Sequence, residues 1–248
     1  GETDIPSTPI SGASDGRSLV ASFNLAGRTL GAWDVVVTNP SGNSGTLPGA
    51  FFVTHTVTVA SGTLQLSWGA CYGVLGGSSS VTLDCADTAA TPARLFGTFQ
   101  AQAVPRVVAM DFTIDIIADG AASLPPFWHL ESGGCNASGL SLLDARPTSG
   151  CTGTASLWGA GGSLSDAVIT AYGAGFGGPN VGRLLFTIAR ASSNPVNSSG
   201  PPTRYFGFEL DVFTDAAMGC AGCGTPLTMI WQSAVIFSVD GPPVTITN

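Results

Sequence analysis

The sequence predicts an all-β protein. Glycine and proline are abundant, with 34 and 16 copies in 248 residues, and both residues interrupt helices. Short runs rich in Val, Ile, Phe and Thr alternate with Gly/Ser-rich stretches, which is typical of short strands joined by turns. Six cysteines add the expectation that disulfides hold these strands together. The length suits one large or two modest domains.

Three β-rich runs near the start of the chain are predicted as strands, at 18–25, 33–38 and 49–54. A turn is expected at 27–31, between the first two. The segment Asn39-Pro-Ser-Gly42 has the composition of a tight turn before the third strand.

The segment from Leu19 through Trp33 and Asn39-Pro-Ser-Gly42 to Val53 resembles the C-terminal half of an IPT/TIG-type immunoglobulin-like domain of bacterial surface proteins. This resemblance covers about 50 residues and implies a partial Ig-like β-sandwich over 1–54. Gly1 would fall in the middle of such a domain, so two explanations stay open. A neighbouring chain supplies the opening strands by strand complementation, or the chain is a fragment.

A second domain is predicted over 55–248, as a larger disulfide-bonded antiparallel β-sandwich with a jelly-roll-like arrangement. Its first strands show the period-2 alternation of half-buried strands. The predicted strands are 56–60, 63–68, 94–100, 107–118, 183–189, 204–213, 229–239 and 244–247. Long Gly/Ser/Ala-rich loops are expected between them.

Three features of this second part resemble an uncharacterised class of secreted bacterial β domains. They are Trp68 followed by Cys71, the segment Leu-Pro-Pro-Phe-Trp at 124–128, and Cys-Ala-Gly-Cys at 220–223. The resemblance covers most of 60–248. It implies export and disulfide bonding, and it carries no activity with it.

The six cysteines allow 15 different pairings. Their spacing favours three sequential disulfides: Cys71 with Cys85, Cys135 with Cys151, and Cys220 with Cys223. For the last pair the alternatives are a redox CxxC motif and half of a zinc site. A thioredoxin-like setting and a second ligand pair are both missing from the sequence, so structural disulfides in an oxidising, extracellular compartment are favoured.

Charged residues are scarce, at 10% of the chain, and the mean hydropathy is +0.35. Part of the surface is therefore expected to be buried against copies of the same chain; the alternative is a monomer with a neutral, hydroxyl-rich surface. A net charge of −8 argues against nucleic acid as a partner. No run approaches the roughly 20 apolar residues of a membrane span, so no membrane insertion is expected.

The sequence contains no recognisable catalytic motif. His55 and His129 are the two histidines, and no Gly-x-Ser-x-Gly or HExxH accompanies them. The glycine run at 172–178 lacks the Lys-Ser/Thr ending of a phosphate-binding loop. We therefore expect no enzymatic activity, no metal and no cofactor.

Two aspartates in one predicted strand are a candidate acid/base pair or calcium site. Asp111 and Asp115 share a face with Thr113, while apolar residues occupy the other face. Such alternation is also typical of an ordinary solvated strand face, which is the favoured interpretation.

Three other residues are candidates for contact with carbohydrate. Trp128, between Phe127 and His129, is a candidate sugar-stacking residue, although a core position is favoured because large aromatics are commonly buried. Asn136 and Asn197 begin Asn-x-Ser sequons and are candidate glycosylation sites.

Two functional hypotheses follow. The first is an extracellular structural protein that self-assembles, as a filament, sheath or surface-layer subunit. The second is a non-enzymatic cell-surface adhesin or a module that binds glycan or protein.

Overall fold

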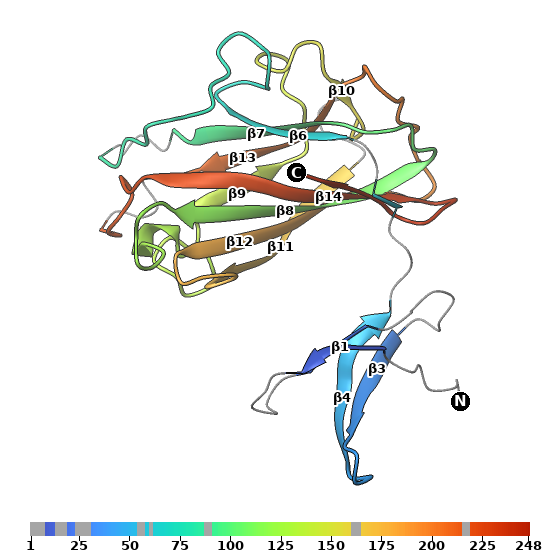
Figure 1. The fold of residues 1–248 in the computed structure, drawn as a ribbon. Helices are drawn as coiled ribbons and strands as arrows, with labels where there is room; N and C mark the ends of the chain where they lie inside the picture. Colours follow the sequence, from blue (N-terminus) through green and yellow to red (C-terminus); the bar gives the residue numbers. More distant parts are fainter. Residues whose placement is uncertain are drawn as a thin grey trace. The chain divides into compact units, whose positions relative to one another are not determined.

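A computed structural model describes residues 8–12, 19–22, 31–53, 58–59, 62–86, 91–159, 165–214 and 219–248. The protein is all-β, as predicted, with a single turn of 3₁₀ helix, η1 (Pro126–Trp128), in the described ranges. The chain forms two compact units, Gly1–Thr56 and Val57–Asn248, where the sequence suggested a boundary near residue 54. Each unit is described separately below (Figure 1).

The first unit contains two antiparallel strand pairs. They are β1 (Thr8–Gly12) with β2 (Leu19–Ser22), and β3 (Gly31–Thr38) with β4 (Ser44–Val53). The predicted turn at Asn39 joins β3 to β4: the Gly42 amide donates to the Asn39 carbonyl at 2.9 Å, and Gly42 has a φ of +88°, a conformation that suits glycine. The strand after this turn starts at Ser44, five residues before its predicted start, because residues 44–47 already pair with 35–38 of β3, ahead of an irregularity that separates them from the pairing at 51–53.

Two sheets make up the second unit. The first sheet has the order β10 (Ala155–Ser156), β13 (Tyr205–Val212), β7 (Ala93–Gln100) and β6 (Thr63–Trp68), and β9 (Leu140–Leu143) also pairs with β13. The second has the order β11 (Ser165–Ala174), β12 (Val181–Arg190), β8 (Val107–Ala118), β14 (Leu227–Ser238), β15 (Val244–Thr247) and β5 (Thr58–Val59). Pairing is antiparallel except between β10 and β13 and between β5 and β15.

The two sheets pack face to face, which confirms the predicted sandwich. The ring of Phe208 on β13 meets three aromatic rings of the opposite sheet edge-on, at centroid distances of 4.8 Å to Phe186, 5.1 Å to Trp231 and 5.3 Å to Phe112. Edge-to-face contacts of this kind stabilise a core beyond the area they bury. The alternating strand pattern of β8 directs Phe112 and its apolar neighbours into this core.

Gly97 gives Phe208 its room. The two residues are opposite each other on β7 and β13, and a Cβ added to Gly97 would lie 2.2 Å from the Phe208 ring. A β-bulge at Gly207, next to Phe208 in β13, lies beside this contact. The Gly207 carbonyl accepts a hydrogen bond of 2.7 Å from the indole N–H of the buried Trp158. Glycines at these two positions thus allow a dense aromatic centre between the sheets.

The predicted disulfide pairing is wrong. The bonds join Cys71 to Cys151, Cys85 to Cys223 and Cys135 to Cys220, over 80, 138 and 85 residues. Each disulfide links two different interstrand connections. The prediction instead placed both cysteines of each disulfide in the same connection. Proximity along the chain favoured the short loops, but the sheet order decides which connections meet. All six cysteines are bonded, so neither a redox pair nor a zinc half-site forms at 220–223.

Three disulfides are consistent with an extracellular location. In the described ranges, no helix is long and apolar enough to cross a bilayer.

Candidate functional site

A cavity of about 450 Å³ opens between the two sheets of the second unit. Leu66 and Trp68 of β6 form one wall, and Leu227 and Met229 at the start of β14 form the other. This is an open side of the sandwich. Among the described residues, β6 pairs with β7 and makes one further bridge, from Trp68 to Ser78, and β15 covers only the 233–236 part of β14. The sheet order therefore leaves a space between β6 and the start of β14, whereas other parts of the sandwich are filled by neighbouring strands.

Two irregular segments complete the lining, residues 79–83 and 223–226. The Cys85–Cys223 disulfide links the first segment to the second, so these walls are covalently tied. Segment 79–83 makes no backbone–backbone hydrogen bond with any described residue. The Ser80 amide donates to the Ser78 hydroxyl at 3.2 Å, which leaves other peptide groups of the segment available to a bound molecule or to water.

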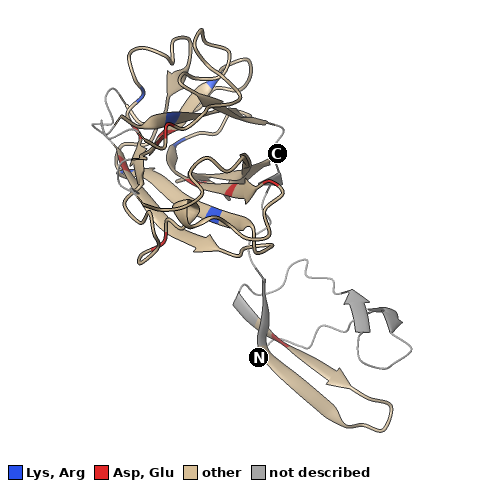
Figure 2. Ribbon diagram, turned by 90° about the vertical axis from the view of Figure 1, so that its left-hand side faces the viewer, with Lys and Arg blue, Asp and Glu red and all other residues tan. Residues whose placement is uncertain are grey.

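Among the described residues, no charged side chain lines the cavity. Apolar and aromatic residues supply about half of its wall, and hydroxyl-bearing residues contribute to the polar half: Ser79, Ser80, Thr82, Thr225 and Thr228. Figure 2 shows the same scarcity of charge along the ribbon of the described residues. A cavity of this size and mixed lining is typical of small-molecule binding sites.

Trp128 lies at the inner side of this cavity and belongs to the core. Its side chain is 1% exposed and packs edge-on against Phe127 at 5.1 Å. A surface platform for sugar stacking is therefore excluded, and the favoured core position is confirmed. The buried indole N–H of Trp128 has no hydrogen-bond partner in the described part of the chain, which is costly for a buried donor.

The candidate acid/base pair of β8 is occupied by cross-strand contacts. Arg183 of β12 binds Asp115 with two hydrogen bonds, at 2.6 and 2.8 Å, and the Thr187 hydroxyl donates to Asp111 at 2.6 Å. Asp115 is 6% exposed, so the predicted solvated face is wrong at this residue. The bidentate ion pair between Asp115 and Arg183 links two neighbouring strands, so a structural role accounts for Asp115.

A second carboxylate pair, which the sequence analysis missed, lies on β13. Glu209 and Asp211 alternate with the core residues Phe208 and Leu210, so both point to the outer face of the first sheet. Both are buried, and the Arg94 guanidinium lies 3.4 Å from Glu209 and 4.0 Å from Asp211. The spacing Glu-Leu-Asp in an otherwise apolar strand is the sequence pattern that would have revealed the pair.

Burial, followed by the charge of Asp211, raises the pKa of Glu209 to about 7, although Arg94 opposes the shift. Burial also raises the pKa of Asp211. A carboxyl group whose pKa is higher in the folded state binds its proton more tightly there than in the unfolded chain. Folding is therefore favoured by this pair at low pH, and the contribution is lost as the pH rises through about 7.

We expect the free energy of unfolding to fall by about 2 kcal/mol between pH 4.5 and pH 8 through this pair. Glu209→Gln replaces the titratable carboxyl group by an amide, so the stability should depend less on pH. Urea denaturation at several pH values between 4.5 and 8 measures this. The control is Asp84→Asn, which removes an exposed carboxylate but keeps a side-chain oxygen to accept from the Ala86 amide, and it should leave the wild-type profile. A wild-type slope that persists in Glu209→Gln would contradict the assignment.

The histidines show no catalytic arrangement in the described ranges. His129 Nδ1 lies 2.6 Å from a Glu131 carboxylate oxygen, and His55 falls outside the described residues. The Tyr172 hydroxyl donates to the Trp128 carbonyl at 2.6 Å, and burial, followed by the charge of Glu131, raises its pKa. No group of three or more metal-ligating side chains occurs among the described residues.

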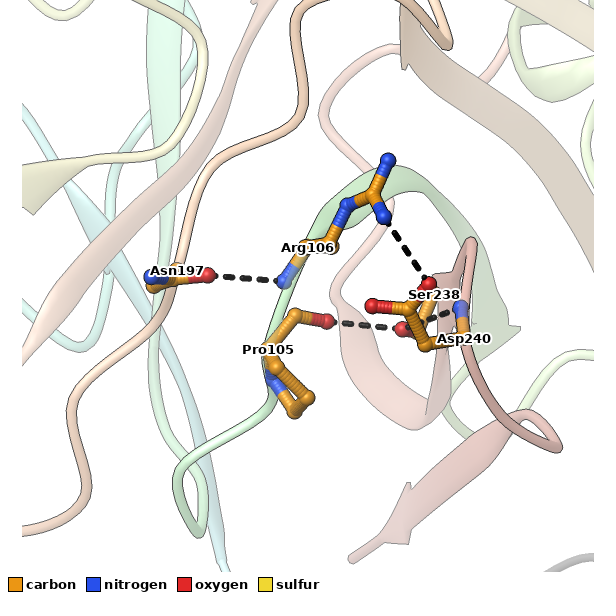
Figure 3. Close-up of polar contacts among 5 residues, drawn as sticks. All are labelled: Pro105, Arg106, Asn197, Ser238 and Asp240. Atoms are coloured by element: carbon orange, nitrogen blue, oxygen red, sulfur yellow. Dashed lines mark hydrogen bonds and ion pairs between the residues drawn. The ribbon is translucent and has the colours of Figure 1, made fainter.

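The two sequons differ in accessibility. The Asn136 side chain is fully buried, with Gly139 closely packed against it, so it has no room for a glycan and that prediction is wrong. Asn197 is exposed, and its Oδ1 accepts a hydrogen bond of 2.9 Å from the Arg106 amide (Figure 3). Glycosylation of Asn197 stays a prediction.

Arg106 has an unusual backbone, with a φ of +47°, and its surroundings explain how it is held. Its guanidinium binds Asp240 at 3.1 Å, and the Ser238 hydroxyl donates to the Pro105 carbonyl at 2.7 Å (Figure 3). With the Asn197 contact, these bonds fasten the start of β8 to the end of β14. The strained residue therefore serves a structural junction.

Comparisons with models of protein families, with curated proteins and with solved structures found no match to this chain. The IPT/TIG resemblance of 1–54 stays a prediction.

Proposed function

We propose that this chain is an extracellular, non-enzymatic structural protein that assembles with copies of itself. The β3–β4 hairpin carries the proposal. Val36, Val37 and Leu47 are each more than half exposed on this hairpin. Because Val36 and Val37 are consecutive in a strand, they point to opposite faces, so the hairpin presents apolar side chains on both.

An isolated two-stranded hairpin is marginally stable in water, and covering its apolar faces would stabilise it. A second copy is a suitable cover because charge is scarce throughout this chain, at 10% of residues, so two copies meet without many charges to desolvate. Strand complementation of an Ig-like unit is the mode of assembly that the IPT/TIG resemblance suggests.

The edge strand β11 offers a second surface for association. It is 10 residues long and pairs with β12, and no other described strand pairs with it. Asp166 is its single charged residue, and Val168 is more than half exposed. Long edges without lysine or proline favour pairing with another chain. Two separate surfaces of this kind support growth into a filament, sheath or layer.

The double variant Val37→Lys/Leu47→Lys tests the proposal. It places charge on one face of the hairpin at exposed positions, so the fold should persist while the dissociation constant of the assembly rises at least about ten-fold. Light scattering over a concentration series and negative-stain electron microscopy measure the effect.

The matched control is Leu75→Lys/Val239→Lys, which adds the same charges at exposed apolar positions of the second unit. Assembly should resemble that of the wild type. A wild-type protein that remains monomeric at high concentration would overturn the proposal, and so would equal loss of assembly in both double variants.

A further inference from the structure

We infer that the cavity between β6 and β14 is a binding site for a neutral saccharide. This inference is independent of self-association, because it concerns residues of the second unit alone and a site without charge.

The ligand is neutral because the described lining offers no counter-ion to a charged group. None of the described residues that line the cavity is charged. A charged group that entered it would lose its water without gaining a counter-ion, which costs several kcal/mol. Acidic sugars, phosphates and cationic ligands are therefore disfavoured.

The ligand is polar because the walls hold unsatisfied groups that a lipid would leave unsatisfied. Segment 79–83 lacks backbone–backbone hydrogen bonds in the described structure. Ser79, Ser80, Thr82 and Thr225 also bring hydroxyl groups to the lining, whereas the Thr228 hydroxyl already donates to Asp119 at 2.7 Å. Several hydroxyl groups on one small molecule match such a set of donors and acceptors.

The ligand also has apolar faces. Trp68 is half-buried in the wall, beside Leu66 and Met229. Aromatic and aliphatic side chains pack against the C–H faces of pyranose rings while the ring hydroxyls contact polar groups. A saccharide combines both properties in a molecule compact enough for a cavity of about 450 Å³.

A peptide strand is the competing occupant, because no described strand pairs with the second edge of the first half of β14. Strand addition needs a continuous row of peptide groups along one edge. The lining instead comes from short pieces of several separate segments, including β6, β7, η1 and two connections. This arrangement surrounds a compact ligand better than an extended one, so the saccharide is favoured.

The test is a titration of the whole protein with cellobiose, maltotriose and triacetylchitotriose, followed by saturation-transfer NMR and tryptophan fluorescence. Digalacturonic acid and trialanine serve as the acidic and peptide probes. At least one neutral saccharide should bind, and neither comparison probe should compete. Binding by trialanine or digalacturonic acid alone, or by no probe, would overturn the inference.

Two variants show whether binding occurs in this cavity. Ser80→Leu/Thr82→Leu replaces two lining hydroxyls by apolar bulk and should abolish saccharide binding, whereas Ser192→Leu/Thr152→Leu makes the same changes at exposed positions outside the cavity and should have no effect. Unchanged affinity in the cavity variant would overturn the site.

Discussion

Gly97→Ala should lower the free energy of unfolding of the second unit by about 3 kcal/mol, at the upper end of the range for overpacked cores. The added methyl carbon would lie 2.2, 2.4 and 2.7 Å from three atoms of the Phe208 ring. That ring cannot move aside easily, because Phe112, Phe186 and Trp231 surround it. Urea denaturation followed by tryptophan fluorescence measures the loss.

Gly241→Ala is the matched control, since a methyl group there meets no atom within 4 Å. We expect a change within about 0.5 kcal/mol for this variant. Adding Phe208→Leu to Gly97→Ala should recover part of the loss, because the smaller side chain frees the crowded space. Wild-type stability in Gly97→Ala would contradict the close contact.

Cys71→Ala/Cys151→Ala should cost about 3.8 kcal/mol. The other two bonds, Cys85–Cys223 and Cys135–Cys220, shorten the loop that this bond closes to roughly 35 residues, and the loop-entropy model gives this value for that length. The two cysteines are 80 residues apart in sequence, and both are fully buried in the main core cluster. Their removal therefore frees the unfolded chain and loosens the packing of the folded one. Denaturation under non-reducing conditions measures the effect, with mass spectrometry to confirm that the other two bonds remain.

Leu75→Ala is the control, because Leu75 is fully exposed. This substitution should change the free energy of unfolding by less than about 0.5 kcal/mol. Peptide mapping of the unreduced wild type gives a second check. Fragments that link Cys71 to Cys151 are expected, whereas fragments that link Cys71 to Cys85 would restore the sequential pairing and contradict the structure.

Local sequence patterns were enough to locate most central strands. The predictions for β6 and β8 match the observed bounds, since both strands have the composition and alternation of half-buried strands. β11 was missed because its end overlaps the glycine run at 172–178, which was interpreted as a loop. The glycine at 182 on the neighbouring β12 accommodates the Tyr172 side chain, since a methyl group there would meet its hydroxyl at 2.0 Å.

Features that depend on sheet order were not predictable from local patterns. The bond between Asp115 and Arg183 joins residues 68 positions apart, and nothing near Asp115 in the sequence indicates a basic partner. The cavity is a further example, because it exists only where β15 stops short of covering β14. Cysteine pairing failed for the same reason, since spacing along a chain does not reveal which connections approach one another.

The pairing of the cysteines also determines how the protein responds to proteolysis. A single cut in the exposed connection between Cys71 and Cys85 leaves one new end attached to Cys151 and the other to Cys223. A cut between Cys135 and Cys151 likewise leaves both ends attached, to Cys220 and Cys71. A nicked molecule would thus stay in one piece until a reductant broke the disulfides.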